Sequence, residues 1–452
     1  MISLARGRVS RANLSRVGWT TGSYGVVQGL RLVNNVVLAH LLAPELFGIM
    51  LIVNTVRTGI ELLSDIGIGQ NVVRAPDAEE PRFYNTAWTL QVLRGLVLGG
   101  VCLALSYPLA HFYDSDVLAK ILPVASLFFI FSGFESIGRA LLQKRIDVVR
   151  MGLFEIGTTI ASVLSYIGFA LIMPNIWALM LGGVASSAAL LIGSYMLVPG
   201  LKLRFAMDRE VATRIFSFGR WVFLSTLVYF LAMNFDRIFM AKTLTLTVLG
   251  IYGIARSLSD LLMLLANKLS VMVVFPLVAS TAADELGGRL RKARPMLLAA
   301  AAVVTGAFAA GSDLTVRILY DDRYREAALI LPVLTLGVWF SVLATLNDAV
   351  VMGMGRPKYG AIANITKLVC LVVGLPIAFG IGGIAGAVWV IALAEVGRYL
   401  ALWWGQRQLK MAFGGQDALF TLAMLAVFVA GRLVLWAVGL TQGPLNFAIP
   451  TG

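Results

Sequence analysis

Residues 327–346 read AALILPVLTLGVWFSVLATL, a run without a single charged side chain. An α-helix of this length rises about 30 Å, which is the thickness of the hydrocarbon core of a bilayer. The apolar residues are continuous and do not alternate with polar ones, so the pattern excludes an outer-membrane β-barrel. The stretch therefore predicts a membrane-spanning α-helix.

The rest of the chain has a similar composition. Hydrophobic residues make up 59% of the 452 residues and charged residues 13%, whereas soluble domains contain roughly 45–50% and ~25%. The mean hydropathy is +0.84. These values exclude a soluble enzyme, a disordered chain and a secreted disulfide scaffold. We expect an all-α, polytopic integral membrane protein.

Thirteen membrane spans are predicted from the distribution of apolar residues. The first follows a basic N-terminal segment and continues to about Leu42, which is longer than the apolar region of a cleaved signal peptide. The predicted spans are 17–41, 46–70, 84–110, 117–140, 149–173, 175–198, 216–241, 247–277, 295–318, 326–353, 360–381, 384–405 and 417–440.

Basic residues gather in alternate loops between these spans. The N-terminal segment and the loops 199–215 and 280–294 belong to the basic set. The positive-inside rule places them in the cytoplasm. The same rule accounts for the formal charge of +13, so no nucleic-acid partner is expected.

An internal repeat relates the two halves of the chain. A shift of 202 residues places Leu38-Ala39-His40 on Met240-Ala241-Lys242 and Phe47-Gly48-Ile49 on Leu249-Gly250-Ile251. Two copies of a six-helix unit are therefore expected, with a binding site between them near the bilayer midplane. The predicted domains are an N-terminal lobe 1–198, a cytoplasmic linker 199–215, a C-terminal lobe 216–410, and an extra C-terminal helix and tail 411–452.

Motifs typical of enzymes are weak or missing. The sequence contains no GxxxxGK[ST] phosphate-binding loop. Asp114 and Asp116 resemble the acidic metal motif of glycosyltransferases, but they lie in a short loop with no soluble domain behind it. The two cysteines and two histidines show no metal-ligand spacing. We therefore expect no enzymatic activity, no metal and no cofactor.

Charged side chains inside the predicted spans are the main functional signal, because each costs about 2.5–3.5 kcal/mol to insert. Some have an opposite charge at helical spacing and are interpreted as neutralising pairs, such as Glu135 with Arg139 and Glu395 with Arg398. The remaining cations lie in both halves and could line one central, water-filled cavity. Such a cavity would bind an anionic substrate.

The candidate substrate-binding residues are Arg31, Arg57, Arg256 and Lys268. The candidate ion-coupling groups, which could equally be ion-pair partners of nearby arginines, are Glu61, Asp65 and Asp260.

Two stretches resemble a known family. Residues 38–48, LAHLLAPELFG, are similar to the turn between the first two helices of oligosaccharide and polysaccharide flippases. Residues 236–256, followed by Phe275-Pro276, are similar to the pattern in the second half of these flippases. The resemblance covers the first twelve predicted spans and extends to the MATE-like exporter superfamily, which also contains multidrug antiporters and lipid II flippases.

The resemblance implies two six-helix lobes in a V that opens alternately to each side of a bacterial inner membrane. It also implies export of an undecaprenyl-pyrophosphate-linked oligosaccharide for exopolysaccharide, capsule or O-antigen synthesis. The partners implied are this lipid-linked substrate, membrane lipids and a polysaccharide polymerase or export machinery.

Two other classes of function compete with this interpretation. A MATE-like multidrug or cation antiporter should present carboxylates and aromatic rings to a cationic drug, not arginine and lysine. A membrane glycosyltransferase or polymerase needs a sizeable catalytic segment outside the membrane, and the predicted loops are too short for one.

Overall fold

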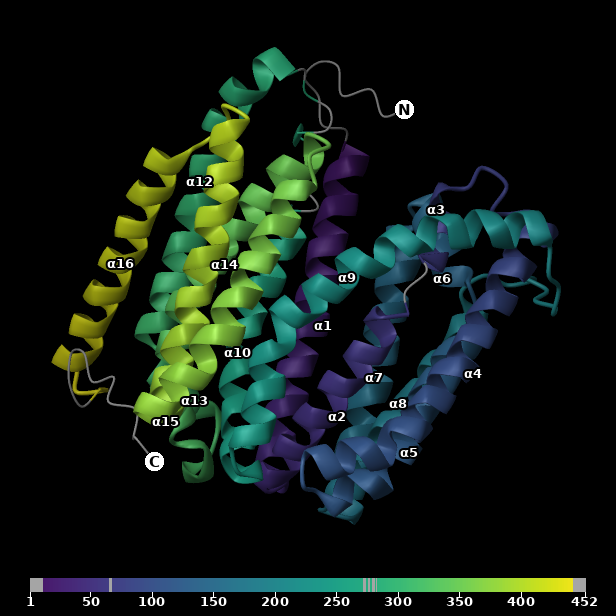
Figure 1. The fold of residues 1–452 in the computed structure, drawn as a ribbon, viewed down its shortest axis with the longest axis horizontal. Helices are drawn as coiled ribbons and strands as arrows, with labels where there is room; N and C mark the ends of the chain where they lie inside the picture. The colour runs from purple at the N-terminus through teal and green to yellow at the C-terminus, as the bar shows by residue number, and fades with distance from the viewer. Residues whose placement is uncertain are drawn as a thin grey trace. The chain divides into compact units, whose positions relative to one another are not determined.

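The computed structural model describes residues 11–64, 67–270 and 283–441, together with residues 274, 277, 278 and 281. The regular elements among these residues are all helical (Figure 1). By its contacts the chain divides into two compact units, Met1–Ala43 with Val56–Thr226, and Pro44–Thr55 with Leu227–Gly452. Helices α2 (Pro44–Leu62) and α9 (Arg209–Thr243) each contribute to both units.

Among the described residues, the first unit is built from seven further helices. They are α1 (Arg11–Leu41), α3 (Ile68–Arg74), α4 (Pro81–Phe112), α5 (Asp116–Phe134), α6 (Gly138–Arg145), α7 (Val148–Ile172) and α8 (Ile176–Met196), of which α3 and α6 are short. Helix α4 packs along α5, and α7 packs along both α1 and α8.

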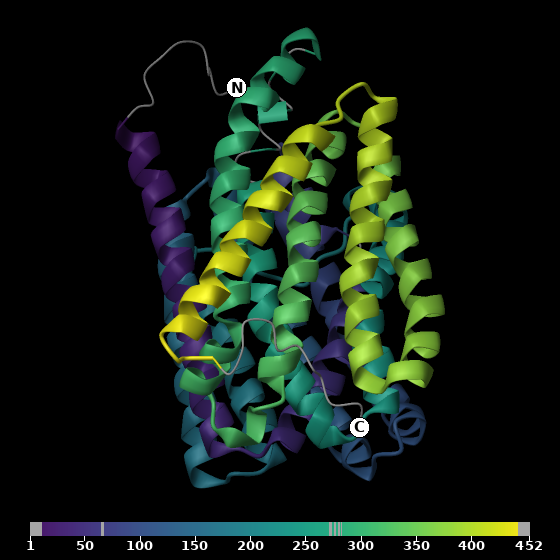
Figure 2. The same cartoon turned by 90° about the vertical axis from the view of Figure 1, so that its left-hand side faces the viewer.

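The second unit contains α10 (Leu246–Leu269), α12 (Ala283–Ala310), α13 (Ser312–Leu319), the 3-10 helix η2 (Asp322–Tyr324), α14 (Ala327–Gly353), α15 (Lys358–Gln408) and α16 (Gly414–Ala437). Helix α14 packs against α10, α12 and α15, and α16 runs beside α12 (Figures 1 and 2). The predicted domain limits, 1–198, 199–215, 216–410 and 411–452, stay a prediction.

The ends of the helices follow from local sequence. Pro44 and Pro81 stand in the first turns of α2 and α4, where a missing backbone N–H costs nothing. Asp147 caps α7 by accepting a hydrogen bond from a backbone amide three residues on, and Asn175 caps α8 by accepting one from the amide of Trp177 at 2.9 Å.

Glycine allows the closest helix contacts. A Cβ atom on Gly95 of α4 would lie 2.6 Å from the Cα of Gly133 in α5, so the two backbones touch at a pair of glycines. In the second unit, a Cβ on Gly48 would collide with the carbonyl oxygen of Leu246, and one on Gly250 with that of Pro44. The internal repeat aligned Gly48 with Gly250, and the structure packs these two positions against each other.

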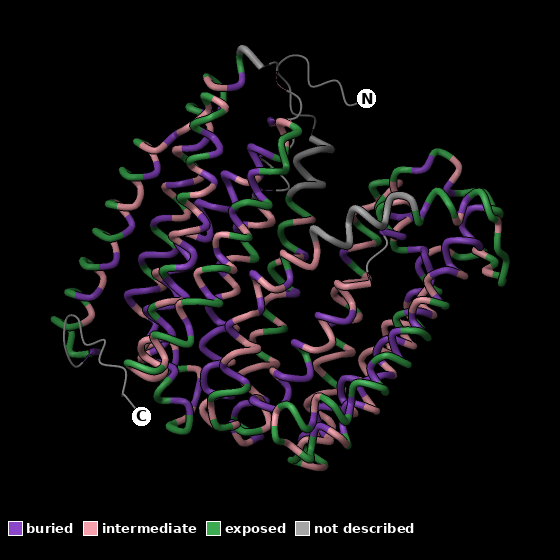
Figure 3. The backbone as a smooth tube through the Cα atoms, viewed as in Figure 1, coloured by how far each residue is buried: buried purple, intermediate pink, exposed green. Residues whose placement is uncertain are grey.

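The stretch 327–346 lies in α14, which is the most buried of the candidate spans. In the most apolar 18-residue stretch of α14, 83% of the residues are buried in protein. The same share is 17% for α16, whose residues are mainly half-buried or exposed (Figure 3). Trp339 and Leu343 of α14 are fully buried within the main apolar cluster of this unit. Hydropathy predicts the span but not this burial, because lipid and protein interior are both apolar.

Helix α15 contains two predicted spans, 360–381 and 384–405. Its backbone leaves the helical conformation at Gly382 and Gly383, and Gly383 has a φ of 55°. A Cβ on Gly386 would collide with the carbonyl oxygen of Ala378, so the two halves fold back on each other as a hairpin (Figure 2). The glycine pair thus ends one span and begins the next.

Nine helices of the described residues are long and apolar enough to cross a membrane, with α15 counted once. The total of thirteen spans stays a prediction. Three predicted spans have wrong limits, because hydropathy averaged over a span does not reveal a short break between two helices. Span 46–70 is divided into α2 and α3, span 117–140 into α5 and α6, and span 295–318 into α12 and α13.

The segment between α8 and α9 is held along α4 by side chains of that helix. Asn85 accepts a hydrogen bond from the amide of Arg204 at 2.8 Å, and Thr89 accepts one from the amide of Ala206 at 3.0 Å. The ring of Phe205 lies 4.9 Å from that of Trp88. The linker is therefore an ordered part of the first unit.

Four ion pairs gather at the same end of this unit. They join Arg82 to Asp208 and Glu210, each at 2.6 Å, Arg214 to Asp77 at 2.8 Å, and Arg145 to Glu79 at 2.9 Å. The acidic loop 71–83 is thereby neutralised by basic segments that the positive-inside rule assigns to one side of the membrane. We name these seven residues the ionic clasp.

Replacing Asp208 by alanine should release the linker. Asp208 pairs with Arg82 and also accepts hydrogen bonds from the amides of Glu210 and Val211 at 3.0 and 3.1 Å. Amide hydrogen exchange over residues 201–208 should become several-fold faster. Glu210→Gln is the matched control, because it removes only the outer partner of Arg82, and equal exchange in both variants would contradict the assignment.

The contribution of Asp208 to the ionic clasp should stay constant from neutral to mildly acidic pH. The hydrogen bond from Arg82 lowers the pKa of Asp208 from 3.8 to about 2. A carboxylate with a lowered pKa stabilises the folded state above its unfolded pKa, and this contribution disappears as the pH falls through the folded value. The exchange rate of the linker should therefore not change between pH 7 and pH 5 after correction for intrinsic exchange.

Candidate functional site

A polar cavity of about 360 Å³ lies inside the first unit. It is enclosed by α1, α7, α8 and the part of α2 that belongs to this unit. Its polar lining residues are Arg31, Asn34, Arg57, Thr158, Thr159, Ser162, Tyr166, Ser186 and Ser187. Two predicted substrate-binding cations, Arg31 and Arg57, therefore meet in one cavity.

Helical spacing places these side chains. Arg31 and Asn34 lie three residues apart on α1, so they share one face. Arg57 extends from α2, where its Nε lies 3.6 Å from the Oε1 of Glu61 one turn later. The guanidinium of Arg57 also lies 5.3 Å from the centre of the Phe128 ring. Glu61 and Phe128 thus hold Arg57 in place beside the cavity.

Unused hydrogen-bonding atoms remain in the cavity wall. The Oδ1 of Asn34 and the Nε of Arg57 are buried and make no hydrogen bond. Buried polar atoms are nearly always satisfied, by protein, water or a ligand. The lining residues that the structure describes include no carboxylate, so the wall offers cationic groups and hydroxyls.

The hydroxyl groups were not predicted from the sequence. Thr158, Ser162 and Tyr166 recur every four residues along α7, which puts them on one face of that helix, and Thr159 lies next to Thr158. This spacing could have been recognised. Ser186 and Ser187 of α8 complete the wall, but their proximity to α7 depends on helix packing.

Glu61 lies beside a second, much smaller pocket of about 30 Å³ between α2, α4 and α5. Arg94 donates to the backbone carbonyl of Glu61 at 2.7 Å and to the hydroxyl of Ser64 at 3.0 Å. A space of this size fits a water molecule between polar groups. Asp65, the other acid predicted on this helix, lies outside the described residues.

Arg256 has a different setting, in the second unit. Its side chain is only 8% exposed, and its Nε lies 3.6 Å from Asp236 and 3.4 Å from Asp260. Asp260 in turn accepts a hydrogen bond from Arg237 at 2.5 Å, and Asp236 accepts one from the hydroxyl of Tyr252 at 2.5 Å. Arg256 and Asp260 are thus two members of a buried ionic network.

The network continues into α15. Lys367 donates to Glu395 at 2.6 Å, and Arg398 lies 3.8 Å from the other oxygen of the same carboxylate. The side chains of Lys367 and Glu395 are 3% and 6% exposed. Arg256 is close enough to interact electrostatically with Glu395. Because its cations face carboxylates, this network fits a structural role better than direct contact with a substrate.

Lys268 lies two turns after Asp260 on α10 and is half-buried. It belongs to the second unit, whereas Arg31 and Arg57 belong to the first. The expectation that all four cations line one cavity therefore stays a prediction. Arg139 forms an ion pair with Glu155 of α7 at 3.2 Å and also interacts electrostatically with Glu135, so the neutralisation of Glu135 by Arg139 stays a prediction.

Comparison with known proteins places this geometry in a family. The sequence model of the family described as "Polysaccharide biosynthesis protein" matches residues 37–329, which is more than half of the chain. The teichuronic acid biosynthesis protein TuaB of Bacillus subtilis (strain 168) is 24% identical over 76% of this chain and 72% of its own length. The lipopolysaccharide biosynthesis protein WzxC of Escherichia coli (strain K12) is 25% identical over 60% and 55%.

Solved structures share the fold. The lipid II flippase MurJ in an inward closed conformation superposes with a TM-score of 0.70, covering 95% of both chains at 14% identity. An inward-facing MATE multidrug transporter gives a TM-score of 0.57, covering 92% of this chain and 96% of the other at 14% identity. The predicted all-α fold of the MATE-like type is confirmed, and the chain is a multi-pass membrane protein that belongs to the polysaccharide biosynthesis protein family.

Proposed function

We propose that this protein is a flippase that moves a lipid-linked oligosaccharide across the bacterial inner membrane. The membership in the polysaccharide biosynthesis protein family and the names of the relatives support this class of substrate. The product would be an exopolysaccharide, a capsule or an O-antigen. The carrier lipid is undecaprenyl pyrophosphate, and the protein acts as a transporter, with no catalytic residues of its own.

The polar cavity carries the proposal. Its two arginines face a wall of hydroxyl groups, and the described lining holds no carboxylate. Arginine binds phosphate through its planar fork of donors, and hydroxyl groups exchange hydrogen bonds with sugars. The cavity therefore fits the head group of a lipid-linked sugar, with its phosphate or an acidic sugar against Arg31 and Arg57.

The buried ionic network takes a supporting role in this proposal. Arg256 and Asp260 keep the second unit rigid while its surroundings change during transport. Lys268 remains a candidate for contact with the substrate, and Glu61 for binding of a coupling ion beside the water-sized pocket. Transport would follow alternating access by the two predicted lobes.

The orientation of the chain belongs to the proposal as well. We place the N-terminus and the ionic clasp in the cytoplasm, because the clasp joins the loop 71–83 to two basic segments, the one at Arg145 and the linker 199–215, at one end of the first unit. A polysaccharide polymerase or export complex would receive the substrate on the other side.

A multidrug antiporter is the competing function, since MATE transporters share the fold. The cavity disfavours it. A cationic drug would meet Arg31 and Arg57 with like charge, and this repulsion is only weakly screened away from water.

Depleting this protein in its native cell should stop export of one glycan while its synthesis continues. Lipid-linked oligosaccharide should then accumulate in the inner leaflet, where a membrane-impermeant glycosidase added to intact spheroplasts does not reach it. Accumulation in the outer leaflet would point to a polymerase. Unchanged glycan with increased sensitivity to cationic drugs would favour the antiporter.

A further inference from the structure

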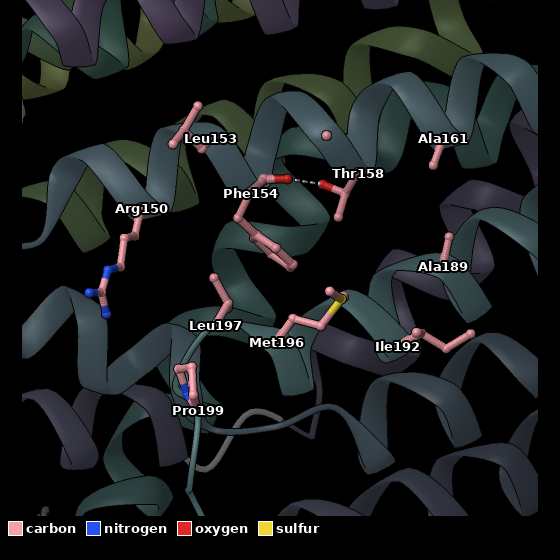
Figure 4. A pocket seen from close by; sticks show the side chains of 12 residues that line it. Arg150, Leu153, Phe154, Thr158, Ala161, Ala189, Ile192, Met196, Leu197 and Pro199 are labelled. Atoms are coloured by element: carbon pink, nitrogen blue, oxygen red, sulfur yellow. Dashed lines mark hydrogen bonds between the residues drawn. The ribbon is translucent and has the colours of Figure 1, made fainter.

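An apolar groove of about 680 Å³ runs between α7 and α8 on the first unit, and of its lining residues it shares Thr158 with the polar cavity. Figure 4 shows Phe154, Met196 and Leu197 pointing toward one another across it, with Arg150 and Pro199 at one end and Ala161 and Ala189 at the other. Both helices are candidate membrane spans. The groove therefore lies among the hydrocarbon chains of the bilayer.

The length of the groove matches one leaflet. Arg150 stands near the start of α7, at the end of the span, and Ala161 lies eleven residues further on. At about 1.5 Å per residue these positions are ~16 Å apart, which is close to half of the ~30 Å hydrocarbon core. One acyl chain that starts at the membrane surface would fill the groove to its deep end.

The two ends of the groove differ in charge. Arg150 is the charged residue of the lining, its side chain is 60% exposed, and its Nε lies 3.4 Å from Asp147. Apart from Thr158, the other lining residues are apolar, and Ile192 and Met196 are 67% and 76% exposed. The groove thus offers a cation at the membrane surface and apolar side chains below it. This arrangement is complementary to an anionic phospholipid, which has a negative phosphate above its acyl chains.

We propose that the groove between α7 and α8 is a binding site for one anionic phospholipid. Its phosphate contacts Arg150, and one acyl chain lies along Leu153, Phe154 and Gly157 on one side and along Ile192 and Met196 on the other. The guanidinium binds the phosphate by charge-assisted hydrogen bonds, which favours anionic over zwitterionic head groups.

Gly157 gives a direct test of the chain path. A Cβ atom at this position meets nothing within 4 Å, so a leucine side chain would enter the groove without displacing protein. Gly168 lies on the same face of α7 three turns further on, also has nothing within 4 Å, and lies outside the groove. Gly168→Leu is therefore the matched control for Gly157→Leu.

The experiment uses the full chain in proteoliposomes that contain phosphatidylglycerol with a photoactivatable diazirine in its acyl chain. Labelled peptides are mapped by mass spectrometry. Labelling should concentrate on residues 153–161 and 189–196, fall strongly in Gly157→Leu and stay unchanged in Gly168→Leu. Unlabelled phosphatidylglycerol should compete with the probe better than phosphatidylcholine does, and Arg150→Ala should lower this preference by about fivefold. A factor of about five corresponds to the binding free energy of one basic residue at an anionic membrane surface.

Labelling that is spread over all exposed spans, or that Gly157→Leu leaves unchanged, would overturn the site. Equal competition by both phospholipids against the unsubstituted protein would overturn its charge specificity. Stronger competition by undecaprenyl phosphate than by phosphatidylglycerol would assign the groove to the carrier lipid instead. None of these outcomes bears on the polar cavity, because that site is tested by transport.

Discussion

Replacing Gly250 by alanine is expected to lower the free energy of unfolding by about 3 kcal/mol, at the upper end of the usual cost of overpacking. The added Cβ would collide with the carbonyl oxygen of Pro44, and Gly48 opposite is equally tight against the carbonyl of Leu246. The obstacle is backbone, so no side-chain rotation can relieve it. The two helices would have to separate along their contact within the second unit.

Gly253→Ala is the matched control for this prediction. Gly253 lies three residues further on α10, and its Cβ would meet the side chain of Leu51 at 3.6 Å, an ordinary contact. Thermal unfolding of both variants in the same detergent measures the difference. If Gly250→Ala unfolds at the temperature of Gly253→Ala, the two helices are not packed as the structure has them.

Replacing Glu395 by glutamine is expected to cost about 3–5 kcal/mol, because it leaves buried cations without their anion. Glu395 is the shared partner of Lys367 at 2.6 Å and Arg398 at 3.8 Å, and all three side chains are nearly inaccessible to solvent. Lys367→Met should cost less, since Arg398 would still face the carboxylate.

An exposed pair supplies the comparison for the Glu395 variant. Glu285 and Arg289 form an ion pair at 2.8 Å on α12 with both side chains more than half exposed. Glu285→Gln should change the free energy of unfolding by less than about 0.5 kcal/mol. Equal losses for Glu285→Gln and Glu395→Gln would mean that the ionic network is not buried in the folded protein.

Transport separates the two roles that charges play in this chain. If Lys367→Met lowers the stability of the protein but leaves the transport rate per folded molecule normal, the network has a structural role. A normal melting temperature with lost transport would contradict it, and would make Lys367 part of the transport mechanism.

Much of the fold could be predicted from local sequence. The spans 149–173 and 175–198 agree with α7 and α8 within two residues, because their apolar runs end at caps and turns that the sequence contains. The break at Gly382 and Gly383 was also expected, since two adjacent glycines interrupt a long apolar run. These features depend on neighbours in the sequence alone.

The ionic partners could be predicted only where they lie one turn apart. Arg57 with Glu61 and Arg256 with Asp260 follow from helical spacing. Lys367 with Glu395 joins the two halves of a hairpin, and its geometry depends on how those halves pack. A single sequence carries no signal for such long-range pairs.

The same limit applies to two further arginines of the second unit. Arg294 pairs with Asp417 at 2.7 Å and Arg432 with Asp313 at 2.9 Å, each across more than a hundred residues. Both arginines are buried at the contact. The sequence assigns Arg294 to the basic loop 280–294 and places Arg432 inside the last predicted span, and in the structure each has an acid that neutralises it.

The candidate site contains residues that the sequence predicts and residues that it does not. Arg31 and Arg57 were predicted because a deep cation in a span needs an explanation, and the structure places both in one cavity. The hydroxyl wall from α7 and α8 was missed, because serine and threonine cost little inside a helix and so stand out less than charges.

The most direct test of the proposed function is the rate at which Arg31→Gln/Arg57→Gln protein moves its lipid-linked oligosaccharide across proteoliposome membranes. Each charge-assisted contact is worth roughly 1.5–3 kcal/mol, so the double variant should flip the substrate at least tenfold more slowly at equal abundance. Lys202→Gln, which removes an exposed cation of the linker outside the cavity, should flip at the normal rate. A normal flipping rate in the double variant would contradict the proposal that Arg31 and Arg57 bind the substrate in the polar cavity.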